Sequence, residues 1–96
     1  MNRIKLEKIR KEIDRVDHKL LNLIGIRTKL VKKITKIKKS KKQIVDKKRI
    51  TLVLKNIRRK SIKKGINPDI TNKIWLAMIR SYIKFERKNF KKIIKF

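Results

Sequence analysis

The chain has 96 residues, no cysteine and a formal net charge of +26, from 33 Lys or Arg against 7 Asp or Glu. The lack of cysteine excludes a disulfide scaffold and a cysteine-based zinc site, and the single histidine, His18, excludes a histidine-rich one. No apolar run approaches the roughly 20 residues of a membrane-spanning helix. The opening MNRIKLEKIRKEID has no apolar signal-peptide core, so we expect a soluble, cytoplasmic, single-domain protein.

Apolar residues recur at helical spacing from about residue 4 to residue 39. The steps of three and four residues are those of an amphipathic helix, and Gly25 does not interrupt them. At 1.5 Å per residue, this helix would be roughly 50 Å long. The stripe consists of Ile9, Ile13, Val16, Leu20, Leu23, Ile24, Leu30, Val31, Ile34 and Ile37.

Two shorter helices are predicted after the polar residues 40–43. One covers residues 47–64, with Asp46 as its N-cap and Gly65 just beyond its end. The other begins at the start signal Asn67-Pro68 and continues to about Asn89. The basic and apolar residues 90–96 are expected to fray.

These lengths predict an all-α fold with three helices and a long first helix. A domain of this size buries only a limited fraction of its surface. No other segment is long enough to cover the apolar stripe of residues 4–39. A second copy of the chain can cover it, so we expect an intertwined homodimer.

Two cations lie on the apolar side of the first helix. Arg27 and Lys38 are 11 residues apart, which is three turns plus roughly 20°, so they share a face with Val31 and Ile34. Buried charges require partners, and acids are scarce here. The pattern leaves two interpretations open: an anion-binding site, or side chains whose stems pack while their charged ends reach water.

Glu86 is a comparable case on the third helix, because it shares a face with Trp75 and Tyr82. It is either a partner in a surface salt bridge or a carboxyl group in an apolar pocket. Burial would favour its neutral form and a nearby Lys38 its charged form. Arg10 lies about 100° around the helix from Arg27, so it could join the same site only from a second subunit.

The high charge has three possible origins at this point. A nucleic-acid binder uses Lys and Arg to neutralise phosphates, and an enzyme for a small anion uses a few placed cations. The third origin is biased composition, since Lys occurs 24 times and Ile 18 times. No nucleotide-binding glycine motif occurs, and no serine is patterned with the histidine for nucleophilic catalysis.

A family resemblance emerges from the same residues. The all-α, AroQ-type chorismate mutases begin with a helix similar to the run Leu6-x-x-Ile9-Arg10-x-x-Ile13-Asp14-x-x-Asp17-x-x-Leu20-Leu21-x-Leu23-Ile24-x-x-Arg27. The similarity continues in order and spacing through Lys38, Asp46-x-x-Arg49 and Ile79-x-x-Tyr82-Ile83-x-x-Glu86. It covers about residues 4–90, and it implies a mutase-like domain at residues 1–90 with a basic tail at residues 91–96.

The resemblance implies an intertwined dimer with two active sites, no cofactor and no metal. Such enzymes rearrange chorismate, a dicarboxylate, to prephenate. Lys38 would donate to the ether oxygen of the breaking C–O bond, and Glu86 would face the same oxygen and need a proton to donate. The residues that bind the substrate would be Arg10 from the other subunit, Arg27, Asp46, Arg49 and Tyr82.

One position departs from the common mutase pattern. Many family mutases have Glu directly after the residue that corresponds to Arg49, whereas this chain has Ile50. Together with Tyr82 and the short spacing from Lys38 to Arg49, this resembles the branch that includes isochorismate pyruvate-lyases, which form salicylate and pyruvate. The prediction is a chorismate mutase, with the lyase as the alternative. A non-enzymatic basic dimer that binds nucleic acid is a second alternative, and no membrane partner is expected.

Overall fold

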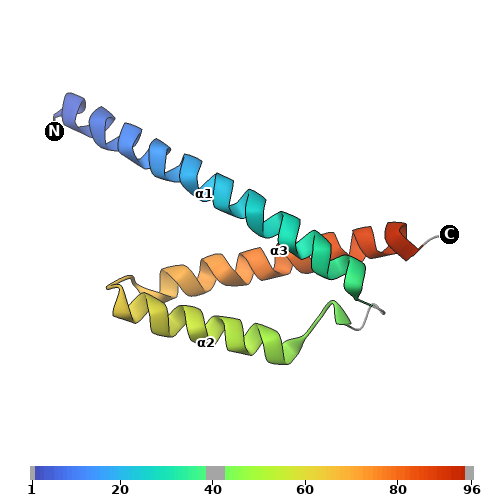
Figure 1. The fold of residues 1–96 in the computed structure, drawn as a ribbon. Helices are drawn as coiled ribbons and strands as arrows, with labels where there is room; N and C mark the ends of the chain where they lie inside the picture. The colour runs from blue at the N-terminus through green and yellow to red at the C-terminus, as the bar shows by residue number, and fades with distance from the viewer. Residues whose placement is uncertain (1, 39–42, 95–96) are drawn as a thin grey trace. The chain divides into compact units, whose positions relative to one another are not determined.

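The computed structural model describes residues 2–38 and 43–94, with side chains described as far as Phe90. Within these residues the chain forms three helices and no strand: α1 (Arg3–Ile37), α2 (Lys47–Lys63) and α3 (Pro68–Ile94) (Figure 1). The all-α prediction is therefore confirmed. None of the helices in the described part is long and apolar enough to cross a membrane.

The chain divides into two compact units, residues 1–30 and residues 31–96. α1 begins in the first unit and ends in the second.

The first unit consists of the N-terminal part of α1. Asn2 caps the helix, since its Oδ1 accepts hydrogen bonds from the backbone N–H groups of Ile4 (3.0 Å) and Lys5 (3.2 Å). None of the described residues from 2 to 30 is buried. The apolar stripe predicted from the sequence is exposed, with Ile9 at 54% and Leu20 at 50% of full exposure.

In the second unit, α2 has well-defined ends. The carboxylate of Asp46 accepts a hydrogen bond from the backbone N–H of Arg49 at 3.0 Å, which confirms the predicted N-cap. At the other end Gly65 has φ +71°, a left-handed conformation that glycine adopts without steric strain. The N–H groups of Gly65 and Ile66 then bind the carbonyls of Ile62 (3.1 Å) and Ser61 (2.9 Å), which forms a Schellman motif.

α3 starts as predicted and ends later than predicted. Asn67 caps it by accepting from the N–H of Asp69 at 2.9 Å. The helix continues to Ile94, so the predicted end at Asn89 is wrong by five residues. Phe90, only 5% exposed, lies four residues after Glu86 and so extends the buried face of the helix. Lys39, the predicted end of the first helix, lies outside the described residues, as do residues 40–42 of the predicted break and residues 95–96. The domain boundary at residue 90 stays a prediction.

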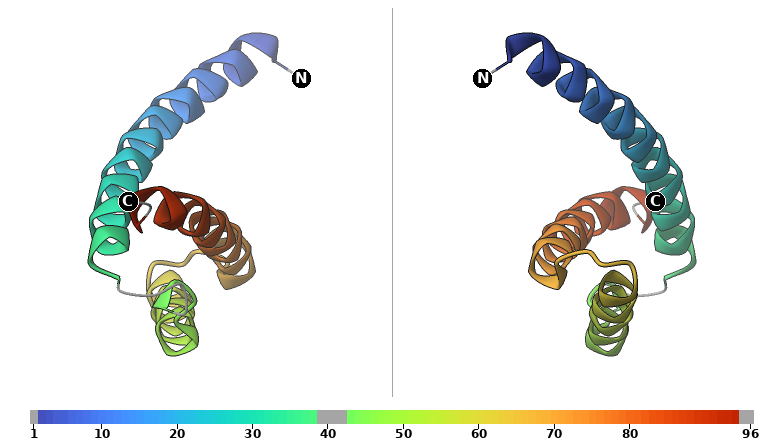
Figure 2. Two further views of the ribbon diagram at one scale, coloured as in Figure 1. Left: turned by 90° about the vertical axis from the view of Figure 1, so that its right-hand side faces the viewer. Right: turned by 90° about the vertical axis from the view of Figure 1, so that its left-hand side faces the viewer.

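α2 and α3 form a helical hairpin and lie side by side (Figure 2). Near their connection, the hydroxyl groups of Ser61 and Thr71 are buried and 2.7 Å apart. The Ser61 hydroxyl donates its proton to the carbonyl of Ile57 at 2.6 Å, so the Thr71 hydroxyl donates to Ser61 Oγ rather than to the more distant carbonyl of Pro68 at 3.3 Å. The two helices are thus joined by a polar contact at one end of the hairpin, with no hydroxyl left without a partner.

Candidate active site

An ion pair joins the end of α1 to α3 within the second unit. The ammonium of Lys38, the residue directly after α1, donates to Oε2 of Glu86 at 2.6 Å. The side chains are 18% and 9% exposed, respectively. Two of the three charged residues that the sequence placed on apolar faces are therefore in contact, although 48 positions separate them. Glu86 is a buried partner of Lys38 rather than a partner in a surface salt bridge.

Neighbouring residues of α1 and α3 are also buried or in contact with one another. Thr35, one turn before Lys38 on α1, is 1% exposed, and its hydroxyl donates to the carbonyl of Val31 at 2.8 Å. The ammonium of Lys32 lies 5.9 Å from the ring centre of Phe85, the residue before Glu86, within the range of a cation–π interaction. Because both side chains of the pair are mostly buried, the attraction between Lys38 and Glu86 is screened less than on an open surface.

Lys38 also lines an open groove of about 730 Å³ between the end of α1 and the start of α2. Among the described residues, its apolar wall consists of Ile34, Ile37 and Val45, and its polar lining of Lys38, Gln43, Asp46, Lys47 and Lys48. A ligand that packs against the apolar wall of this groove could also contact the Lys38 ammonium. No group of three or more His, Asp or Glu side chains among the described residues could hold a metal ion.

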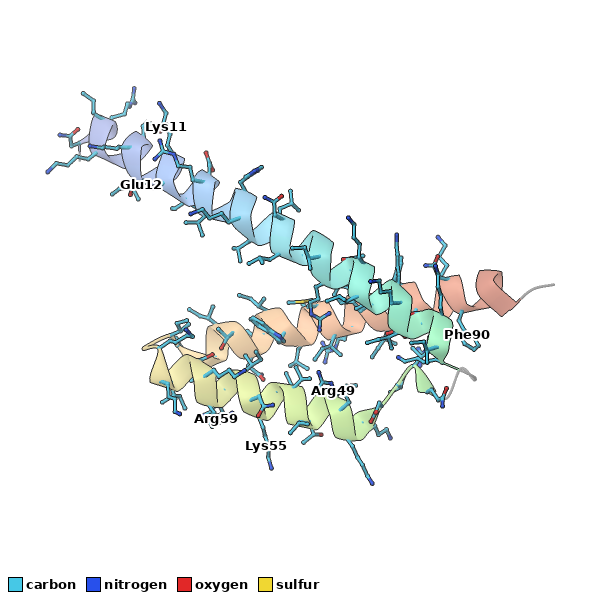
Figure 3. All side chains as sticks on the ribbon, in the orientation of Figure 1. Lys11, Glu12, Arg49, Lys55, Arg59 and Phe90 are labelled. Atoms are coloured by element: carbon cyan, nitrogen blue, oxygen red, sulfur yellow. The ribbon has the colours of Figure 1, made fainter. Side chains whose placement is uncertain are left out.

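Two of the predicted substrate-binding residues lie at the start of α2. Asp46 lines the groove and caps the helix with the same carboxylate. Arg49, labelled in Figure 3, lies in the first turn of α2. Its side chain is exposed. It lies four residues before Val53 and seven before Asn56, which are half-buried, so its position belongs to the side of α2 that packs on α3.

Tyr82 is half-buried on α3, one turn before Glu86. The spacing of four residues places both on one face of the helix. The structure thus brings Lys38, Glu86 and Asp46 to one region of the second unit and places Arg49 and Tyr82 on the two helices of its hairpin.

The remaining two predicted residues lie in the first unit. Arg10 is exposed and forms an ion pair with Glu7 at 3.0 Å, with side-chain exposures of 61% and 57%. Arg27 is half-buried. Their approach to the substrate, and the contribution of Arg10 from a second subunit, stay predictions.

Sequence reasoning missed Lys47 and Lys48 as lining residues of the groove. A signal was present, because Lys47, Lys48 and Arg49 place three cations in the first turn of α2, which has no acid. The positive end of the helix dipole disfavours cations there by about 0.3–1 kcal/mol each. A local rule broken three times in succession is a reason to look for a functional role.

Comparison with known proteins identifies the family to which this chain belongs. The family model described as chorismate mutase type II matches residues 9–87. No curated protein and no solved structure gave a match. The matched range contains α2, most of α1 and α3, and every candidate site residue of the second unit. The chain therefore belongs to the chorismate mutase type II family, a family of isomerases.

Proposed function

We propose that this chain rearranges chorismate to prephenate at a site centred on Lys38 and Glu86. The family match supports the activity. The proposed location of the active site rests on the 2.6 Å contact between Lys38 and Glu86, beside a groove with an apolar wall.

The reaction is an intramolecular rearrangement, in which one C–O bond breaks while one C–C bond forms and no atom is gained or lost. It needs no nucleophile and no general base. The protein has to hold the folded conformer of the substrate and to stabilise the negative charge that develops on the ether oxygen. A cation fixed at an apolar wall is suited to the second task.

Lys38 is the proposed donor to the ether oxygen. Its ammonium has three N–H donors, and the contact with Glu86 uses one of them. Removing one preorganised donor of this kind costs a factor of about 10²–10³ in kcat. Glu86 is then a positioning residue, because its carboxylate holds the ammonium at the groove. The alternative, a protonated Glu86 that itself donates to the ether oxygen, follows from the family resemblance alone.

The arginines are the proposed anchors of the two substrate carboxylates. Arg27 and Arg49 would act in one subunit and Arg10 from its partner, with Asp46 near the substrate hydroxyl and Tyr82 along the ring. Guanidinium groups suit this role because they bind carboxylates through two parallel hydrogen bonds.

The exposed stripe of the first unit supports the homodimer that this arrangement needs. Ile9, Ile13, Val16 and Leu20 are each at least half exposed. Apolar surface of this kind gains about 25 cal/mol for each Å² that it buries. An antiparallel partner helix would cover the stripe and carry Arg10 to the other subunit's site.

The lyase stays a second candidate because of Ile50. This half-buried residue of α2 directly follows Arg49, and it offers no carboxylate to a substrate hydroxyl. With isochorismate, the same cations would assist elimination of pyruvate to leave salicylate.

The deciding experiment incubates the purified protein separately with chorismate and with isochorismate. Prephenate from chorismate supports the mutase, whereas salicylate and pyruvate from isochorismate support the lyase. The Lys38→Ala variant serves as the control for a contaminating enzyme and should be nearly inactive in both assays. Absence of all three products at high protein concentration contradicts both proposals.

A further inference from the structure

We propose that Lys47 and Lys48 form a cationic rim of the groove that captures the dianionic substrate before the chemical step. The inference rests on the proposed function and assigns these two lysines a role that the family resemblance does not give them. It concerns substrate capture, not the stabilisation of the reacting atoms.

The first argument is the sign of the charge at the groove. Among the described residues that line the groove, the formal charges of Lys38 and Asp46 cancel, and Lys38 is also paired with Glu86. Lys47 and Lys48 therefore supply the net positive formal charge of this described lining. A local positive charge of this kind concentrates a small anion at the entrance of a groove.

The second argument is that Lys47 and Lys48 are accessible to solvent. Both lysines are exposed. Neither lysine takes part in the ion pair of Lys38 with Glu86 or in that of Arg10 with Glu7. The exposed ammonium groups of the rim are therefore accessible to an anion from solution.

The third argument is their position on the helix. Lys47 and Lys48 open α2 together with Arg49, where the helix dipole disfavours cations. The same dipole adds to the positive potential at the groove. The two lysines and the positive end of the helix dipole therefore both attract a substrate with two carboxylates.

The test compares the Lys47→Gln/Lys48→Gln double variant with the unsubstituted protein in chorismate turnover. At a salt concentration of about 50 mM the double variant should have a KM raised by about 5–10-fold and a kcat changed by less than about twofold. At about 500 mM salt the difference in KM should shrink to less than about twofold, since exposed charges are then screened.

Arg59→Gln/Lys63→Gln is the matched control. It removes the same charge from exposed positions of α2, roughly 17–24 Å along the helix axis from the rim. Its KM at low salt should stay within about twofold of the unsubstituted protein. An equal rise of KM in both variants would mean that total charge, not the rim, attracts the substrate, and would overturn the inference.

The remaining outcomes are also decisive. An unchanged KM in the rim variant, or a loss confined to kcat, overturns the inference while the proposed function stands. If the unsubstituted protein does not turn over chorismate, the proposed function fails, and the rim is then tested with malonate as the probe. Weaker, salt-sensitive malonate binding by the rim variant, measured from amide shifts of Gln43 and Val45, supports the rim; unchanged binding contradicts it.

Discussion

The two units of this chain differ in whether their apolar side chains are buried. In residues 31–90, side chains such as Phe90 and Ile44 are buried at 5% and 4% exposure, and the charged Glu86 is buried with its partner Lys38. In residues 2–30 nothing is buried, although an apolar residue recurs at almost every turn. The second unit thus has interior contacts of its own, whereas the first presents one unpaired face.

This difference indicates where the partner of the proposed homodimer would pack. An isolated helix gains little stability in water, because most helical stability in proteins comes from packing of an amphipathic face. The first unit also carries Arg10 and Arg27, two of the proposed carboxylate anchors. If a second copy covers the stripe, the same contact that stabilises the first unit completes the active site.

The largest effect is expected for Lys38→Ala in the second unit. Loss of the donor to the ether oxygen should lower kcat about 10²–10³-fold, with a much smaller change in KM. Steady-state kinetics with chorismate measures both. Lys36→Ala, at an exposed position two residues earlier, is the control and should keep kcat within about twofold. Full activity of Lys38→Ala would show that the electrophile is wrongly assigned.

Leu20→Glu tests the unpaired face of the first unit. Burying a carboxylate in a helix interface should weaken the homodimer about 100-fold, corresponding to about 3 kcal/mol. Sedimentation at several protein concentrations measures the dissociation constant. Asn22→Glu adds the same charge on the opposite side of α1 and should leave the dimer intact. Equal dissociation constants for the two variants would contradict the proposed interface.

Mixed dimers test whether the two units act across subunits. Arg10→Ala and Lys38→Ala should each be nearly inactive as pure proteins. After subunit exchange in an equal mixture, half of the dimers are hybrids with one intact site, so about a quarter of the full activity should return. If both residues act within one subunit, no hybrid has an intact site and the mixture stays inactive.

Glu86→Gln distinguishes the two roles of the buried carboxyl group. If the carboxylate positions Lys38, the neutral amide holds the ammonium less firmly, and kcat should fall about tenfold at all pH values. If a protonated Glu86 donates to the ether oxygen, kcat/KM of the unsubstituted protein should fall as pH rises. The Gln variant should then keep its activity and flatten that profile. A pH series on both proteins separates the two outcomes.

Local features of this fold were predictable from sequence because their causes lie within a few residues. The caps at Asp46 and Asn67 and the turn at Gly65 depend on neighbouring backbone groups, and all three are confirmed. The end of α3 was missed because it depends on the burial of Phe90, which no local pattern reports. Burial requires knowledge of what packs against the helix.

The candidate site was also predictable only in part, because its residues have local signals but their contacts do not. Lys38 and Glu86 were identifiable because a charge on an apolar stripe is anomalous wherever it occurs. Their contact was not derivable, since it joins residues from α1 and α3 that are 48 positions apart. The rim was missed because Lys47 and Lys48 resemble the many other lysines of this chain until the groove beside them is known.

The smallest effect is expected at the far end of the hairpin, where Thr71→Val should affect stability alone. The substitution removes the 2.7 Å contact with Ser61, but the Ser61 hydroxyl keeps its bond to the carbonyl of Ile57. Because no buried donor is left unpaired, the loss should be that of one hydrogen bond, about 1 kcal/mol. For a domain of this size, that lowers Tm by about 4–8 °C.

Thr51→Val is the control for this change, because it removes an exposed hydroxyl that donates to the carbonyl of Lys47 at 3.0 Å. Its Tm should change by less than about 2 °C, as for most surface substitutions. The dimer dissociation constant of Thr71→Val should equal that of the unsubstituted protein, whereas Leu20→Glu should change it strongly. If Thr71→Val instead dissociates the dimer, the packing of the α2–α3 hairpin depends on the partner subunit. The contrast between the two units would then have to be replaced by a single cooperative interface.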